Sequence, residues 1–183
     1  MRRLLLPLLL FFFSFASSAQ SEIYEISNGT VRFHSDAPQE LIKASSDQLK
    51  GAIDIRKRTF AFKLNISSFV GFNSPLQREH FNENYMETVY YPFATYIGKI
   101  IEEVDLSKDG DYTVRTKGKL KIHGAEQERI IKSEINVKNG VMTIESDFVV
   151  PLADHNIKIP RVVYDKLAPD INVSVNAILV PKK

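Results

Sequence analysis

A segment near the middle of the chain alternates two kinds of residue, and this period restricts the fold more than any other feature. One face of the segment from Tyr112 to His123 holds Tyr112, Val114, Thr116, Gly118, Leu120 and Ile122, and the other holds Thr113, Arg115, Lys117, Lys119, Lys121 and His123. Successive side chains of a β-strand point to opposite faces, so a two-residue period indicates a strand with one buried face. We therefore predict a long, half-buried strand here.

The same alternation recurs along most of the chain. It is clear at residues 60–67, 131–138 and 171–179, and weaker strand candidates are 22–26, 29–35, 40–45, 50–55 and 92–104. Asn139-Gly140 is a two-residue hairpin signal between residues 131–138 and 141–150, since both types tolerate positive φ. Eight or nine strands predict an all-β fold, either a closed barrel or a sandwich, and the length of several strands favours an antiparallel barrel.

Two short helices are expected to interrupt the strands. Ser74, Pro75 and Gln77 have the spacing of a capping box with proline at the first helical position. This helix should run to about Phe81 and could extend to Met86. A second helix could span residues 160–167, ahead of Pro169.

The N-terminus has the parts of a secretory signal. Arg2 and Arg3 precede an apolar run, and Ser17-Ser18-Ala19 is a small-residue cleavage site. We predict a signal peptide over residues 1–19, a single domain over 20–183, and export to the periplasm or the medium. Without Arg2 and Arg3, 22 of the 24 basic residues remain against 22 acidic ones. A neutral mature chain argues against a nucleic-acid partner.

The sequence also disfavours proteins that depend on cysteine chemistry and barrels that span a membrane. The chain has no cysteine, which excludes disulfides, thiol nucleophiles and an acylated-cysteine anchor. An outer-membrane barrel would turn its apolar face to lipid and its polar face inward. Mid-strand Lys and Arg would fill a narrow eight-stranded lumen poorly, so we predict a soluble barrel with apolar side chains inside, not an integral membrane protein.

Three short stretches together resemble the YceI-like, lipocalin-like proteins. They are His80-Phe81 with Tyr91-Pro92-Phe93-Ala94-Thr95-Tyr96, then Leu120-Lys121-Ile122-His123-Gly124, and finally Ser146-Asp147-Phe148. The chain departs from the family where Gln77-Arg78 replaces an Arg-Asp pair and Lys121 replaces Thr. The first departure puts any head-group or anchoring role of that pair in doubt.

The resemblance implies an extended eight-stranded barrel with an elongated apolar cavity. It also implies a periplasmic or secreted binding protein for a polyisoprenoid or fatty-acid-like molecule, with no cofactor. The alternative is a packed exported barrel that acts through surface protein interactions in a stress response. A homodimer is left open.

The inward positions of the predicted strands supply the cavity lining. A long apolar ligand needs a tunnel of apolar groups with few obligatory hydrogen bonds, although the same residues would equally form a packed core. Gly118, Ser133 and Ala177 should leave space. The predicted lining residues are Phe60, Phe62, Leu64, Leu120, Ile122, Ile131, Ile135, Ile144, Phe148, Val173 and Val175.

No catalytic or metal motif accompanies this pattern. The four histidines show no metal-binding spacing, and no nucleophile elbow or phosphate-binding glycine loop occurs. We therefore expect no enzyme activity and no metal. His80 and His123 are predicted near the cavity mouth, either contacting a ligand head group, pinning the short helix over the barrel, or serving only as structural residues.

Overall fold

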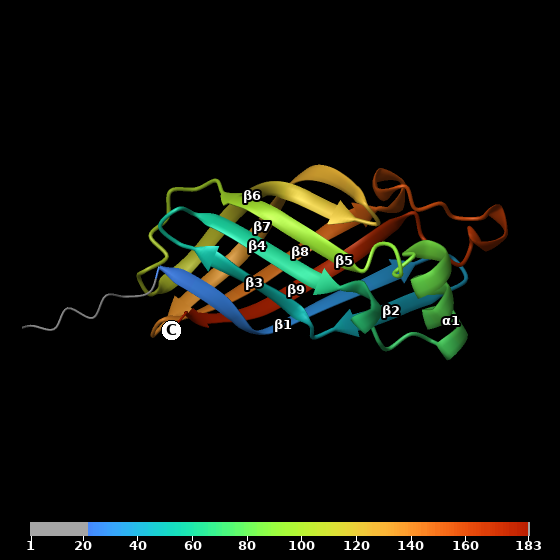
Figure 1. The fold of residues 1–183 in the computed structure, drawn as a ribbon, viewed down its shortest axis with the longest axis horizontal. Helices are drawn as coiled ribbons and strands as arrows, with labels where there is room; N and C mark the ends of the chain where they lie inside the picture. Colours follow the sequence, from blue (N-terminus) through green and yellow to red (C-terminus); the bar gives the residue numbers. More distant parts are fainter. Residues whose placement is uncertain (1–21, 183) are drawn as a thin grey trace, which may run out of the picture.

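Nine strand segments form one antiparallel sheet in the computed structural model, which describes residues 22–182 (Figure 1). The predicted signal peptide and its cleavage after Ala19 lie outside these residues. The segments are β1 (Ile23–Asp36), β2 (Leu41–Ser46), β3 (Leu49–Asp54), β4 (Thr59–Asn65), β5 (Phe93–Ile100), β6 (Gly110–Ile122), β7 (Ala125–Lys138), β8 (Val141–Pro151) and β9 (Asp170–Pro181).

The nine segments occupy eight positions around a closed barrel. β1 pairs with β9 along one edge, which closes the sheet. Along its other edge β1 pairs with β2 through Val31↔Ser46 and with β3 through Ile23↔Asp54. Ile23 lies eight residues before Val31, and its partner Asp54 lies eight residues after Ser46, so the antiparallel register continues unchanged from β2 to β3. β2 and β3 are therefore one interrupted strand. The predicted eight-stranded antiparallel barrel is confirmed.

Most predicted strands match, with two differences. The candidates 22–26 and 29–35 are one strand, β1, with a register shift between Ile26 and Asn28. A β-bulge of this kind breaks the two-residue period without ending the strand. β5 ends at Ile100, well before the predicted residue 104, and the chain then turns so that Leu106 is buried.

Two hairpins have two-residue turns with positive φ, and the one at Asn139-Gly140 is the turn that the sequence predicts. His123 and Gly124 have φ of 48° and 75°, and Asn139 and Gly140 have φ of 52° and 74°. The flanking pairs Ile122↔Ala125 and Lys138↔Val141 enclose two-residue loops, for which two positive φ values match the twist of the strands.

Short helical turns connect β4 to β5 and β8 to β9. α1 (Pro75–His80) begins after Ser74, whose side chain accepts a hydrogen bond from the Gln77 amide, and it continues as the π-helical turn η2 (Phe81–Tyr85). The remaining turns are 3₁₀ helices: η1 (Ile66–Ser68), η3 (Leu152–His155) and η4 (Arg161–Val163). The second predicted helix is thus reduced to η4 and the turns after it.

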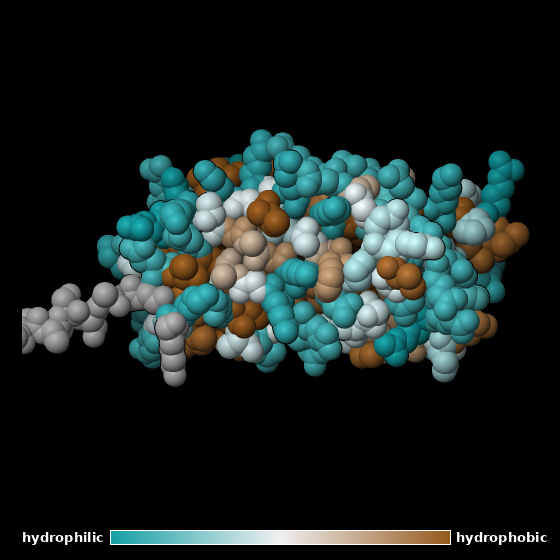
Figure 2. All heavy atoms as spheres, in the orientation of Figure 1, coloured by the Kyte–Doolittle hydropathy of each residue, from teal (hydrophilic) through white to brown (hydrophobic). Residues whose placement is uncertain are grey.

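The outer face of the barrel is charged, whereas the inner face is apolar. Along β6 and β7 exposed and buried positions alternate, and exposed cross-strand ion pairs join Lys117 to Glu128 and Lys119 to Glu126. Hydrophilic residues cover much of the visible face (Figure 2). None of the helices among residues 22–182 is long and apolar enough to cross a membrane.

Candidate functional site

The interior of the barrel contains a cavity of about 560 Å³ with a mainly apolar wall. It lies between two clusters of buried side chains, since residues of both clusters line it. Small barrels of eight strands commonly fill themselves with side chains. A cavity of this size is therefore a specific property of this sequence rather than a consequence of the architecture.

One end of the barrel is closed by side chains. Tyr24, Met142 and Leu179 are fully buried there, and Leu106 enters from the β5–β6 connection with 1 % of its surface exposed. The Tyr112 hydroxyl holds that connection in place, donating to the carbonyl oxygens of Asp105 and Lys108 at 3.0 Å each. The cavity is thereby separated from solvent at this end.

The opposite end is covered by the segment between β4 and β5. Four phenylalanine rings join this segment to β1: Phe33 lies 5.0 Å from Phe69 and 5.6 Å from Phe81, and Phe72 lies 5.0 Å from Phe81, between ring centroids. All four rings line the cavity. Ring pairs at such separations add to the stabilisation from burial, so this aromatic cluster forms an apolar lid.

Polar side chains fasten the lid at its rim. The Gln77 side-chain amide donates to Glu40 at 2.8 Å, and the Arg78 guanidinium donates to the Ser67 carbonyl oxygen at 3.1 Å. Gln77 and Arg78 are the residues at which the chain departs from the pattern that it resembles, and both make contacts that position α1 over the barrel.

The polar groups inside the cavity satisfy one another. The Tyr96 hydroxyl donates to the Thr116 carbonyl oxygen at 3.1 Å, and the Ser146 hydroxyl donates to the Ser133 hydroxyl at 2.7 Å. Burial raises the pKa of the Tyr96 phenol above its usual value of 10.0, so the hydroxyl is protonated at neutral pH. A wall whose polar groups are already paired does not penalise an apolar occupant for leaving them unsatisfied.

All eleven predicted lining residues lie on the cavity wall. Ser133 and Ala177 also line it, as expected for small residues that leave space. Gly118 does not have that role: it lies opposite Gly98 in the β5–β6 register, and a Cβ at Gly118 would come within 2.8 Å of the Tyr96 ring. The tyrosine occupies the space that we expected to remain open.

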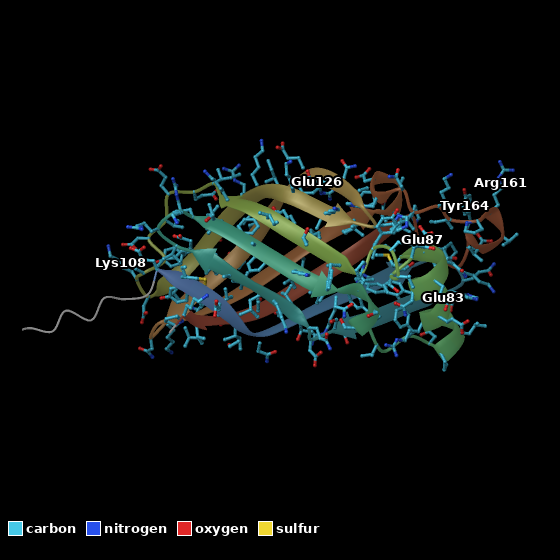
Figure 3. The ribbon with its side chains drawn as sticks, in the orientation of Figure 1. Glu83, Glu87, Lys108, Glu126, Arg161 and Tyr164 are labelled. Carbon is cyan, nitrogen blue, oxygen red and sulfur yellow. The ribbon has the colours of Figure 1, made fainter. Side chains whose placement is uncertain are left out.

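The two predicted histidines have different environments. His80 lies on the cavity wall near the lid. His123 lies in the β6–β7 turn, where its Nε2 is 2.6 Å from Glu87 Oε2 and its Nδ1 is 3.1 Å from the His155 carbonyl oxygen. Glu87 lies just after η2, at the end of the barrel that carries α1 (Figure 3). Of the roles expected for His123, these contacts correspond to pinning the helical segment.

The lid residues Phe33, Phe69, Phe72 and Phe81 were missed from sequence. Phe33 lies in a predicted strand on the same face as Val31, so its inward direction could have been inferred. Phe69 and Phe72 lie in an irregular segment between η1 and α1, where no period indicates which way a side chain points.

His155, the last residue of η3, anchors the connection between β8 and β9 to the β6–β7 turn. It is fully buried, and its Nδ1 lies 3.2 Å from the Ala125 carbonyl oxygen. Burial lowers the pKa of the imidazole below its ordinary value of 6.5, and the nearby Ala125 carbonyl and Asp154 carboxylate oppose this only in part. The ring is therefore neutral in the folded protein at neutral pH.

We expect the free energy of unfolding to fall as the pH is lowered below about 6.5. The unfolded chain binds a proton at His155 near that pH, whereas the folded chain binds it only at lower pH. Stability is thus lost at up to about 1.4 kcal/mol per pH unit between the two pKa values. Urea unfolding from pH 7.5 to 5 measures this slope. His155→Gln, which keeps a donor for Ala125, should flatten it, and an unchanged slope would contradict the assignment.

The described residues contain no cluster of three or more histidine, aspartate and glutamate side chains that could hold a metal ion. The polar groups on the cavity wall are mostly hydroxyls together with rim side chains such as Glu40, Gln77 and Lys166. This arrangement is suited to enclosing an apolar molecule and contacting a polar group at the mouth.

Comparisons with known proteins agree with this architecture. A model of the YceI-like domain matches residues 19–179. The structure is similar to a polyisoprenoid-binding domain from Saccharophagus degradans implicated in plant cell wall breakdown, with a TM-score of 0.74, 15% identity, and coverage of 87% of this chain and 98% of that one. Burkholderia cenocepacia BcnA has a TM-score of 0.68 and 12% identity, with coverage of 82% of this chain and 95% of that one. The Campylobacter jejuni YceI protein has a TM-score of 0.55 and 14% identity, with coverage of 100% of this chain and 99% of that one. No curated protein sequence matches the chain.

Proposed function

This chain belongs to the YceI-like domain family, and we propose that it is an exported binding protein that holds one long apolar or amphipathic molecule in its barrel. The observation that carries the proposal is the apolar cavity of about 560 Å³ beneath the phenylalanine lid. The proposed ligand class is a polyisoprenoid or a fatty-acid-like chain.

The energetics of this proposal are those of a hydrophobic core. Each methylene group transferred from water to an apolar environment contributes about 0.8 kcal/mol. A chain of ten such groups therefore gains about 8 kcal/mol, which is set against the translational and rotational freedom that the ligand loses. The eleven predicted residues and the four lid rings would supply the contacts, with His80 at the mouth near the polar end of the ligand.

The choice of ligand class rests on the similarity to the Saccharophagus degradans domain. At 15% identity that similarity supports the fold, and the polyisoprenoid is our extension to this chain. Export to the periplasm or the medium rests on the signal predicted over residues 1–19. We propose a carrier or storage role without catalysis, cofactor or metal.

A packed barrel acting through its surface is the alternative. The cavity argues against this alternative, because a barrel selected only for its outer surface would gain stability by filling about 560 Å³ of apolar space with larger side chains. Small residues such as Ser133 and Ala177 on the wall leave this space empty instead of filling it.

We expect the mature chain, produced from Gln20 in its natural compartment, to carry a stoichiometric apolar molecule. Native mass spectrometry would detect the added mass, and solvent extraction of the purified protein would identify the class. A protein that shows only its own mass, and takes up neither geranylgeraniol nor palmitate, would contradict the proposal and favour the packed-barrel alternative.

A further inference from the structure

The loop between η3 and β9, residues 156–169, contributes to both the cavity and the outer surface. Val163, Lys166 and Leu167 lie on the cavity wall. Val162 and Tyr164, which flank Val163, have 89 % and 58 % of their surface exposed. Arg161 and Tyr164 lie at the end of the molecule, beyond α1 (Figure 3). We call this segment the portal loop.

The portal loop is cationic although the mature chain is neutral. Lys158, Arg161 and Lys166 are opposed within the loop only by Asp165. Elsewhere on the barrel, exposed cations such as Lys117 and Lys119 pair with glutamates. None of the three portal cations makes an ion pair within residues 22–182.

The loop is attached to the barrel behind its exposed tip. The Gln39 amide donates to the Asp165 carbonyl oxygen at 2.8 Å, and the Ala168 amide donates to the Ser35 hydroxyl at 2.9 Å. These bonds fix the end of the loop next to the cavity. The tip around Val162 is held by a local bond from the Val163 amide to the Pro160 carbonyl oxygen, at 3.0 Å.

We propose that the portal loop docks on the surface of an anionic lipid bilayer, with Val162 and Tyr164 entering the headgroup region and Lys158 and Arg161 contacting lipid phosphates. Exposed apolar side chains flanked by cations are the composition of an interfacial membrane segment. Tyrosine has an apolar ring and a polar tip, which suits the boundary between headgroups and acyl chains. Docking in this way turns the cavity mouth toward the membrane.

The site and its surroundings favour a bilayer over a protein partner. The inference rests on the proposed function, because a ligand of low water solubility resides in membranes and must enter or leave the barrel there. Two acidic residues, Glu79 and Glu83, lie on α1 and η2, and Glu83 is set back from the tip of the loop (Figure 3). Repulsion from anionic headgroups would limit docking to the portal loop.

The chain has no tryptophan, so one introduced tryptophan is an unambiguous reporter. Tyr164→Trp is expected to shift its emission to shorter wavelength with vesicles of phosphatidylcholine and phosphatidylglycerol in equal parts, and not with phosphatidylcholine alone. Val141→Trp, in the β7–β8 hairpin at the closed end, is the matched control and should not respond. Unchanged emission from the Tyr164→Trp variant with anionic vesicles would overturn the proposal.

Vesicle co-sedimentation of the protein with its natural Tyr164 separates the contributions of the cations and of the apolar side chains to membrane binding. Lys158→Gln/Arg161→Gln should weaken binding to the anionic vesicles about 30-fold, since each cation contributes about 1 kcal/mol near such a surface. Val162→Ser/Tyr164→Ser should also weaken binding. All four positions are exposed, and circular dichroism would verify the fold of each variant.

Four outcomes distinguish this inference from its alternatives. Equal binding of the natural protein and both double variants would refute the role of the portal loop. A dimer in sedimentation velocity that the Val162→Ser/Tyr164→Ser change dissociates would assign the surface to a second copy instead. If native mass spectrometry detects ligand but the protein binds no vesicles, the proposed function stands and the docking is refuted. If the protein binds vesicles but carries no ligand, the docking stands and the proposed function is refuted.

Discussion

Val175→Phe is expected to lower ligand affinity about 50-fold while leaving the barrel folded. Val175 lies on the cavity wall in β9, between Val31 on β1 and Ser146 on β8. The added ring would enter existing empty space, so it should not strain the core in the way that overpacking does. It would displace about three methylene groups of the ligand at about 0.8 kcal/mol each.

The measurement is the fraction of protein that retains ligand in native mass spectrometry, together with a titration of the extracted protein. Ile178→Phe is the matched control, because Ile178 lies three positions further along β9 on the outer face, with 39 % of its surface exposed. It should retain ligand as the natural protein does. If Val175→Phe also retained the ligand fully, the binding site would lie outside this part of the cavity.

Much of the barrel could be predicted because its signal is local. In β6 and β7 the side-chain direction follows from the two-residue period alone, so a single alternating run assigns every second residue to the interior. The hairpins at His123-Gly124 and Asn139-Gly140 are equally local, since positive φ restricts the residue types there. The predicted lining residues reached the wall for this reason.

The strand pattern alone does not predict the hollow interior, because the interior depends on contacts between distant segments. Gly118 illustrates this: the pattern places it inward, but Tyr96 from the neighbouring strand fills the space beside it. The contact between Phe33 and Phe69 joins β1 to a segment without regular structure. Whether inward side chains fill a barrel is set by the sum of their volumes and rotamers, which no period encodes.

Leu179→Ala should be among the most destabilising single truncations in the barrel. Leu179 is fully buried at the closed end, opposite Met142 on β8 and Ile26 on β1. Truncating a leucine in a well-packed core costs about 3 kcal/mol, because the transfer free energy is lost and a new cavity remains. For a domain of this size that corresponds to a fall in Tm of about 6–12 °C.

Leu120→Ala is the comparison that makes this result informative about function. Leu120 is also buried, with 6 % of its surface exposed, but it borders the existing cavity. A side chain next to empty space has fewer packing partners to lose, so in the ligand-free protein this truncation should cost about half as much as Leu179→Ala. Thermal and urea unfolding of delipidated samples would measure both. Because the two truncations remove the same atoms, equal losses would mean that Leu120 is packed as tightly as Leu179, and the barrel would have no room for a ligand. A smaller loss at Leu120, with weaker ligand binding in the same variant, would identify the empty space and its use in one experiment.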